Sequence, residues 1–225
     1  GPHIMADTLA FDVYGTLIDT NGVVRLLASM IGDTAPAFSH QWRDKQLEYA
    51  FRRGLMRRYR NFAVCTRDAL EYTNASLKTA LSERQKQQLL ECYRTLPAYA
   101  DAAPALQALE ADRFRLYAFS NGSADTVEAL LEAAGIGDRF LDIVSVDEIG
   151  AFKPDPAVYR HFLERASAPA DAAWLISGNP FDVIGAISAG MNGAWVQRSP
   201  EALFDPWEVE PTLTISTLTE LKNRL

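Results

Sequence analysis

Cysteine, histidine and positive charge are all scarce in this chain of 225 residues. The two cysteines, Cys65 and Cys92, are too few for a disulfide framework and fit a reducing compartment, so we expect a cytoplasmic protein. The three histidines are scattered and give no metal-binding cluster. The formal net charge of −7 argues against nucleic acid or an anionic membrane surface as a partner.

Long apolar runs are also absent. No stretch approaches the roughly 20 apolar residues that span a bilayer, and no secretory signal pattern opens the chain. Gly1-Pro2-His3-Ile4 resembles the remnant of an expression tag, with Met5 as the expected native start. Hydrophobic residues make up 48% and charged residues 23%, which suits one large globular domain or a core with a smaller inserted domain.

The order of the expected elements indicates an α/β fold. Thr8 to Phe11 is a short apolar run that predicts a buried strand. In the next stretch, of about eighty residues, apolar residues recur at helical intervals, so helices are predicted there. Ser82–Gln85 is a capping-box signature for the start of one of them. From Asp101 onward helices and strands alternate, and strands are predicted over 114–119, 141–146, 172–177 and 193–197.

Alternating units with short connections predict a parallel sheet with helices on both faces, which is a Rossmann-like core. Because the helical stretch is inserted after the first strand, we expect it to form a cap over the carboxyl edge of the sheet. The predicted domains are therefore an α/β core of residues 6–20 and 100–225 and a helical cap of residues 21–99.

Polar residues follow four of the predicted strands: Asp12, Ser120-Asn121, Lys153 in the loop after its strand, and the stretch 177–182. Each group alone has an ordinary explanation as a turn residue, a solvated lysine or, for Asp182, a first-turn acid favoured by the helix dipole. Ligands of open parallel sheets bind outside the carboxyl ends of the strands. Together and in this order, the four groups predict one catalytic site at that edge.

With these motifs the chain resembles the haloacid dehalogenase superfamily and, within it, the L-2-haloacid dehalogenases. The resemblance runs from about Leu9 to Arg198. It rests on Phe11-Asp12-Val13-Tyr14-Gly15-Thr16-Leu17, Trp42-Arg43-Asp44-Lys45-Gln46-Leu47-Glu48-Tyr49, Ser120-Asn121-Gly122-Ser123, Ser145-Val146-Asp147 with Lys153-Pro154-Asp155, and Ser177-Gly178-Asn179-Pro180-Phe181-Asp182.

The resemblance implies a role for each motif residue. Asp12 would be the nucleophile, and Arg43 and Asn121 would receive the departing halide. Charges around the nucleophile and the substrate carboxylate would be held by Ser120 and Lys153. The hydrolytic step would be supported by Ser177, Asn179 and Asp182, the last acting with Lys153 as base or water-orienting pair.

The pocket wall is implied to include Tyr14, Leu47 and Phe62. For Leu47 and Phe62, ordinary packing between helices is an equally open explanation. Phe181 stands where the family commonly has tryptophan, which removes an indole donor and leaves the halide and chain-length preference open.

Two positions separate the chain from related metal-dependent phosphatases. Tyr14 stands where such phosphatases place an aspartic acid, and a phenol with a pKa of about 10 is a poor acid at neutral pH. Gly178 stands where their fourth motif supplies a carboxylate for Mg²⁺. Neither a metal nor another cofactor is therefore expected, because Lys153 can keep Asp12 ionised.

The predicted function is hydrolysis of (S)-2-haloalkanoic acids to (R)-2-hydroxy acids through an aspartyl ester. The expected partners are a small 2-haloacid and water, and similar enzymes imply a homodimer formed through cap helices. Two alternatives remain: a metal-dependent phosphatase of the same fold, and a catalytically silent binding protein on this scaffold.

Overall fold

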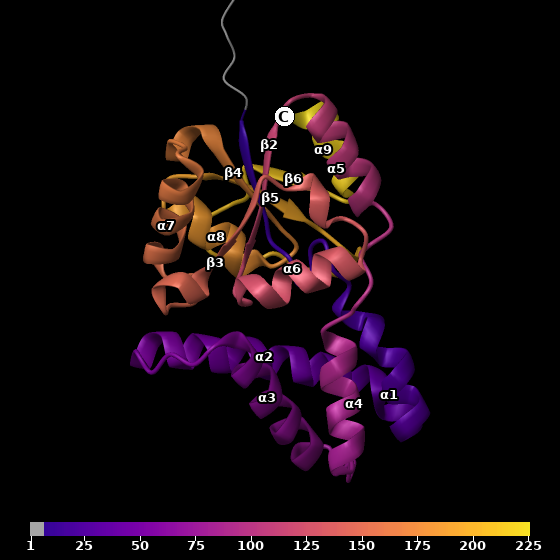
Figure 1. The fold of residues 1–225 in the computed structure, drawn as a ribbon. Coiled ribbons are helices and arrows are strands. Elements are labelled where there is room, and N and C mark those ends of the chain that lie inside the picture. Colours follow the sequence, from indigo (N-terminus) through magenta and orange to yellow (C-terminus); the bar gives the residue numbers. More distant parts are fainter. Residues whose placement is uncertain (1–6) are drawn as a thin grey trace, which may run out of the picture.

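The computed structural model describes residues 7–225 (Figure 1). The expected tag and start at Met5, and residue 6 of the predicted core, lie outside the described residues. One six-stranded sheet with the strand order β3-β2-β1-β4-β5-β6 forms the centre of the molecule, and all of its pairs are parallel. The strands are β1 (Thr8–Phe11), β2 (Arg115–Ser120), β3 (Asp142–Ser145), β4 (Ala173–Ser177), β5 (Asn192–Val196) and β6 (Leu213–Ile215).

The five expected strands are present within one or two residues of their predicted bounds, but the edge strand β6 was not expected from the sequence. It has three residues, and its burial runs from half-buried through exposed to buried. Alternation over three residues is too short to distinguish a strand from a loop. It pairs with β5 at Val196 and Ile215, and this pairing is a tertiary effect.

Helices cover both faces of the sheet. The helices α5 (Ala102–Ala111) and α6 (Ala124–Ala133) lie on one side, together with the short C-terminal α9 (Leu221–Arg224). The helices α7 (Pro156–Ala166) and α8 (Pro180–Ser188) lie on the other side (Figure 1). This arrangement confirms the predicted α/β, Rossmann-like fold.

The remaining helices form a separate layer below the carboxyl ends of the strands in Figure 1. They are α1 (Val24–Ile31), α2 (Ala35–Met56), α3 (Phe62–Ser76) and α4 (Glu83–Tyr93). The predicted capping box is confirmed, because the Ser82 side chain accepts from Gln85 N and the Gln85 side chain accepts from Ser82 N. The helical layer follows β1 directly, as predicted, and its assignment as a cap domain of residues 21–99 stays a proposal.

Local chemistry sets where some of these helices begin and end. The α2 helix stops at Met56 because Arg57 adopts a left-handed conformation with φ 54°. Asn61 caps α3 by accepting a hydrogen bond from Val64 N (3.2 Å). Ser123 holds the N-cap position of α6, but its hydroxyl bonds the side chain of Thr126 (2.9 Å) rather than the helix backbone.

Strand register sets the geometry of the site. Phe11 at the end of the central strand β1 lies opposite Ala118 of β2 and Ile176 of β4. The next residue, Asp12, donates its backbone N–H to Ile176 O (3.0 Å) and leaves the sheet level with Ser177. The residue after β1 is therefore held between the ends of two neighbouring strands, facing the helical layer.

Within the described residues 7–225, every helix is too short or too polar to cross a membrane.

Candidate active site

The Asp12 carboxylate is the centre of the site, with only 6% of the residue exposed. Five donors surround its two oxygens. Oδ1 accepts from Val13 N (2.9 Å) and Lys153 Nζ (3.2 Å). Oδ2 accepts from Thr16 Oγ1 (3.1 Å), Ser177 Oγ (2.7 Å) and Asn179 Nδ2 (2.6 Å).

These donors decide the charge of Asp12. Burial by itself raises the pKa of this carboxyl group, but the Lys153 ammonium and the hydrogen bonds from Ser177 and Asn179 lower it below its ordinary value. The group is therefore a carboxylate at neutral pH, which is the form that can act as a nucleophile.

Lys153 uses all three of its N–H donors. Its ammonium bonds Asp12 Oδ1 (3.2 Å), Asp182 Oδ2 (2.7 Å) and the backbone oxygen of Phe119 (2.7 Å), and only 1% of the residue is exposed. Burial lowers the pKa of Lys153, but the two carboxylates more than compensate and raise it above its ordinary value. The lysine is thus a permanent positive charge between two acids.

Asp182 lies behind this lysine, fully buried at the start of α8. Its Oδ2 accepts from Lys153, and its Oδ1 accepts from the Tyr159 hydroxyl (2.7 Å). Burial raises the pKa of Asp182 to about 6, with the Asp12 charge adding to the rise while Lys153 and Tyr159 oppose it. Its charge state therefore changes closer to neutral pH than that of an ordinary aspartate.

Arg43 approaches the site from the helical layer, on α2. Its Nη1 donates to Gln46 Oε1 (2.8 Å), and its Nη2 donates to Tyr14 O and to Asn179 Oδ1, each at 3.2 Å. All three acceptors are neutral, so these bonds orient the planar guanidinium without cancelling its charge. Among residues 7–225 no carboxylate lies within salt-bridge distance of Arg43, although its charge also helps to lower the pKa of Asp12. An anion that enters the cavity would therefore meet an arginine that forms no ion pair.

Gln46 anchors this arginine from a fully buried position. Its Oε1 also accepts from the Tyr93 hydroxyl (3.1 Å), and its Nε2 donates to Thr66 Oγ1 (2.7 Å). Buried amides are costly unless bonded, and the bonds to α2, α3 and α4 side chains meet that need. The network links three helices to the orientation of Arg43.

A small cavity lies between the sheet edge and the helical layer. It measures about 10 Å³, room for about one water-sized probe. The residues that line it are Asp12, Tyr14, Arg43, Leu47, Phe62, Asn121, Lys153, Asn179 and Phe181. All nine belong to the set that the sequence predicted, so residues from both the sheet edge and the helices gather at one point.

Three predicted residues do not line the cavity. Ser177 supports Asp12 from below through its hydroxyl, and Asp182 is screened by Lys153. The Ser120 hydroxyl accepts from Gly122 N (3.0 Å) and so shapes the loop after β2. Asn121 does line the cavity, and its Oδ1 accepts from Lys153 N (3.0 Å), which leaves its amide N–H groups for a ligand.

Sequence reasoning missed Thr16, Tyr159 and Gln46. Thr16 stands in the first motif and donates to Asp12, while its oxygen accepts from Gly178 N (2.9 Å). Nothing in the sequence marks Tyr159 as a site residue, because a tyrosine on an amphipathic helix is ordinarily assigned to the hydrophobic core. Gln46 could have been found, because it lies among the buried residues of α2 and a polar residue on a buried helix face requires hydrogen-bond partners.

The fourth-motif position has no room for a metal-binding acid. A Cβ atom added at Gly178 would collide with the backbone oxygen of Gly15, so only glycine fits this close approach. Among the side chains of residues 7–225, no three of His, Cys, Asp and Glu gather into a set that could hold a metal ion.

Tyr14 is equally unsuited to donate a proton. Its ring stacks on Tyr93 with a centroid distance of 5.8 Å, and burial followed by the proximity of Tyr93 raises the pKa of its hydroxyl well above the ordinary value. The position that carries an acid in related phosphatases is therefore an apolar wall here.

The fold and the site together are those of a Rossmann-like α/β protein with a buried carboxylate at the end of its first strand. The family model of haloacid dehalogenase-like hydrolases matches residues 6–190, so the chain belongs to that family. This confirms the resemblance found in the motifs.

Individual relatives show which members of the family this chain is similar to. An (S)-2-haloacid dehalogenase of Pseudomonas putida is 35% identical over 217 residues, 96% of this chain and 95% of the relative. Haloacetate dehalogenase H-2 of Moraxella sp. (strain B) is 34% identical over 212 residues, 94% of each chain. The solved L-2-haloacid dehalogenase of Xanthobacter autotrophicus with chloropropionic acid covalently bound has a TM-score of 0.90 at 30% identity, covering 97% of this chain and 98% of that one.

Proposed function

We propose that this protein hydrolyses the carbon–halogen bond of (S)-2-haloalkanoic acids to give (R)-2-hydroxy acids and halide. The observation that carries the proposal is a carboxylate, Asp12, kept ionised at the wall of a cavity that also holds an uncompensated arginine, Arg43. The Xanthobacter relative with covalently bound chloropropionic acid supports the same chemistry.

In the first step an Asp12 oxygen attacks C2 of the substrate and forms an ester as the C–halogen bond breaks. The halide leaves with the bonding electron pair, on the side opposite the attack, so C2 is inverted. Arg43 and the amide N–H groups of Asn121 are the donors placed to receive it. Lys153 offsets the repulsion between the nucleophile and the anionic substrate.

In the second step water adds to the ester carbonyl carbon of Asp12, and the ester oxygen leaves with C2. Whichever Asp12 oxygen becomes the carbonyl oxygen retains at least two donors: Val13 N and Lys153 on one side, or Thr16, Ser177 and Asn179 on the other. These donors form an oxyanion hole before the reaction begins. Asp182, through Lys153, is the base or water-orienting partner.

A single turnover in H₂¹⁸O, with enzyme in excess over (S)-2-chloropropionate, tests this mechanism. The product oxygen comes from Asp12, so the lactate should be mostly unlabelled and the peptide containing Asp12 should gain one ¹⁸O. Labelled lactate with unlabelled Asp12 would mean that water attacks C2 directly. Consumption of the (R) enantiomer at an equal rate would contradict a pocket with a single line of attack.

A metal-dependent phosphatase is the main alternative, and Gly178 and Tyr14 oppose it. Halide release should be unchanged by excess EDTA. A loss that Mg²⁺ restores, together with release of phosphate from a phosphate monoester, would favour the phosphatase. A protein that released neither halide nor phosphate would be the silent binding protein.

We also propose that residues 21–99 act as a cap domain on a core of residues 6–20 and 100–225, and that the protein is a cytoplasmic homodimer. The free thiols of Cys65 and Cys92 fit a reducing compartment. The exposed apolar side chains of Met56 and Tyr72 support association through α2 and α3. Light scattering after size exclusion would give the mass directly, and a monomer at micromolar concentration would reject the dimer.

A further inference from the structure

The catalytic cavity is nearly closed, but two of its walls are shared with a much larger groove. Lys153 and Phe181 border both spaces. The groove measures about 620 Å³ against about 10 Å³ for the cavity. The catalytic cavity therefore continues, behind one phenylalanine, into open apolar space.

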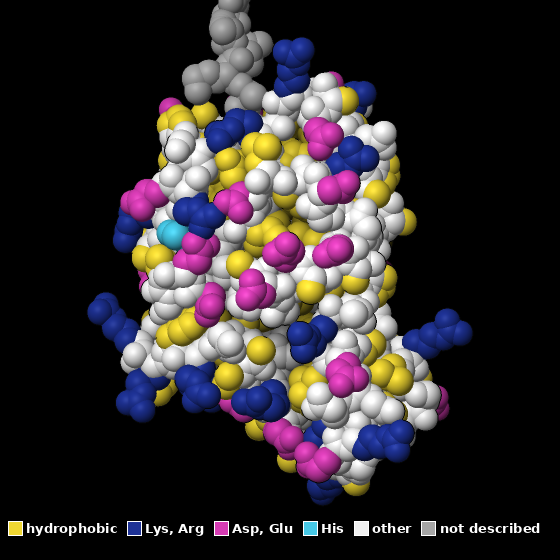
Figure 2. Space-filling view, viewed as in Figure 1, with side chains coloured by type: hydrophobic (Ala, Val, Ile, Leu, Met, Phe, Trp, Pro, Cys, Tyr) yellow, Lys and Arg dark blue, Asp and Glu magenta, His cyan; other side chains and the backbone are white. Residues whose placement is uncertain are grey.

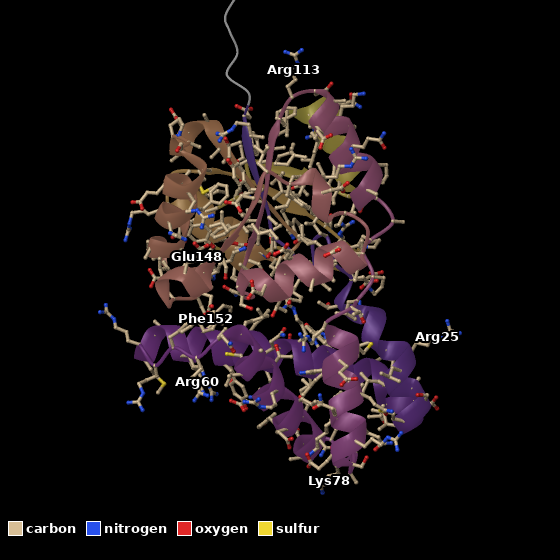
Figure 3. All side chains as sticks on the ribbon, viewed as in Figure 1. Arg25, Arg60, Lys78, Arg113, Glu148 and Phe152 are labelled. Carbon is tan, nitrogen blue, oxygen red and sulfur yellow. The ribbon has the colours of Figure 1, made fainter. Side chains whose placement is uncertain are left out.

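The groove runs between the end of α2 and the loop that carries Lys153. Apolar side chains supply most of its surface: Phe51, Leu55, Phe152, Pro154, Phe181 and Trp207. Phe152, labelled in Figure 3, lies between α2 and the α/β layers. Leu55 and Trp207 are 87% and 63% exposed, so this groove keeps large apolar side chains in water.

An aromatic pair lies where the groove adjoins the cavity. The rings of Phe51 and Phe181 meet edge to face, with centroids 5.0 Å apart and planes at 79°. Both residues are partly exposed rather than locked in the core. Rotation of the Phe181 side chain would join the two spaces without moving the backbone that holds Asp182.

Gly54 lines the groove, and a glycine at this position does not stabilise the helix that contains it. It lies inside α2, where glycine costs about 1 kcal/mol relative to alanine. A Cβ atom added there would find only Phe152 Cβ within 4 Å, at 3.8 Å. The missing side chain leaves space that belongs to the groove.

We propose that this groove binds the alkyl chain of 2-haloalkanoic acids longer than propionate, with Phe181 as the gate between the chain and the reacting carbon. The proposal rests on the dehalogenase function and specifies its substrate class. C2 stays beside Asp12, while carbons beyond C3 pass Phe181 and lie on Phe152, Leu55 and Trp207.

Charge around the groove favours an amphipathic anion as the occupant. The groove is lined by Arg57 and by one acid, Asp155. The chain around the end of α2 carries four further arginines, of which Arg52 and Arg53 pair with acids on the helical layer: Arg52, Arg53, Arg58 and Arg60. In Figure 2, Lys and Arg side chains gather over this part of the helical layer, whereas acidic side chains lie across the α/β part. These arginines would draw an anionic 2-haloacid toward this face by long-range attraction, and the apolar lining of the groove would then bury its alkyl chain once C2 has reached Asp12.

The test compares kcat/KM for (S)-2-bromohexanoate with that for (S)-2-bromopropionate, and the readout is the ratio of the two. Each buried methylene should contribute about a fourfold gain by apolar transfer, so the wild-type ratio should be above one. Gly54→Phe fills the groove and should lower the ratio about tenfold or more. Circular dichroism checks that this variant is folded.

A matched leucine pair makes the test independent of Gly54. Leu55→Ala removes a groove wall and should lower the ratio several-fold. Leu203→Ala removes an equally exposed leucine (84%) that does not line the groove, and the ratio should not change. Both side chains are in water, so neither change threatens folding.

The outcomes are distinct. If Gly54→Phe lowers both rates equally, the groove is only an entrance, and the proposal is overturned. If a second copy covers the groove, Leu55→Ala will change the mass in solution but not the ratio, which also overturns it. If wild type releases no halide from bromopropionate, the dehalogenase function itself fails, whereas halide release with an unchanged ratio rejects the groove alone.

Discussion

Two cations lie near Asp12, and their hydrogen-bond partners differ in charge. Lys153, at the sheet edge, is matched by two buried carboxylates and a backbone oxygen. Arg43, on the helical layer, bonds a side-chain amide oxygen of Gln46, another of Asn179 and a backbone oxygen. The lysine has no N–H donor left for a ligand, whereas the arginine donates only to neutral oxygens.

This difference divides the work between the two layers. A buried acid cannot stay ionised without a nearby positive charge, and Lys153 supplies that charge permanently, whether or not substrate is present. A leaving halide needs a cation that is not already satisfied, and a neutral hydrogen-bond network can aim Arg43 without consuming its charge. We therefore propose that the sheet edge keeps Asp12 ionised and that the helical layer recognises the anion.

The largest expected effect comes from removing the sheet-edge cation. Lys153→Met leaves Asp12 and Asp182 buried without their shared partner, which costs about 3–5 kcal/mol for a broken buried pair, and halide release should be lost. Urea unfolding at pH 7 measures the loss in free energy of unfolding. Lys45→Met removes a lysine whose side chain is 20% exposed and pairs with the more exposed Glu48, and should cost no more than about 1 kcal/mol. Equal losses for the two variants would contradict the division of roles.

Replacing the helical-layer cation should reduce catalysis without affecting stability. Arg43→Lys keeps the charge but loses the planar fork that reaches Gln46, Tyr14 and Asn179 together, so kcat should fall on the order of 10²-fold or more. Arg52→Lys, at an exposed arginine paired with Glu48, serves as the matched control. Near-wild-type turnover for Arg43→Lys would mean that this arginine does not receive the halide.

Giving Arg43 a carboxylate partner of its own would remove the difference between its hydrogen bonds and those of Lys153. Gln46→Glu has nearly the same shape and places a negative charge at the oxygen that accepts from Arg43 Nη1. We expect kcat/KM to fall on the order of tenfold as the arginine is neutralised, with the fold retained. Gln88→Glu makes the same charge change at an exposed residue of α4 and should leave kcat/KM unchanged. An unaffected Gln46→Glu enzyme would show that the free charge of Arg43 is not used.

The smallest expected effect is a shift in pH dependence. If hydrolysis needs ionised Asp182, activity should fall as pH decreases below its pKa of about 6. The Tyr159 hydroxyl donates to this carboxylate and so lowers its pKa. Tyr159→Phe should therefore move the acid limb of the kcat profile to higher pH by less than about one unit. Tyr117→Phe is the control, because Tyr117 bonds Arg115 far from the site. A limb that stays in place, or moves to lower pH, would remove Asp182 from the hydrolytic step.

Much of the site could be predicted because topology brings strand ends together. Once Thr8–Phe11 is read as the first strand of a parallel sheet, Asp12, Asn121, Lys153 and Asn179 must converge on one edge. The positions of Arg43, Leu47 and Phe62 came from the resemblance instead, since no rule of periodicity says which face of an inserted helix meets the sheet.

The sequence by itself determined the α/β order, the carboxylate of Asp12 at the end of the first strand, the lysine at 153 near the same edge and the lack of a fourth-motif carboxylate at Gly178. Only the tertiary structure decided that Ser120 turns to its own loop, that Tyr159 supports Asp182, and that Gln46 rather than an acid orients Arg43. The reason is physical. Strand ends are placed by the backbone pattern that local sequence encodes, whereas a side chain's partner depends on which atoms of distant helices fill the space around it.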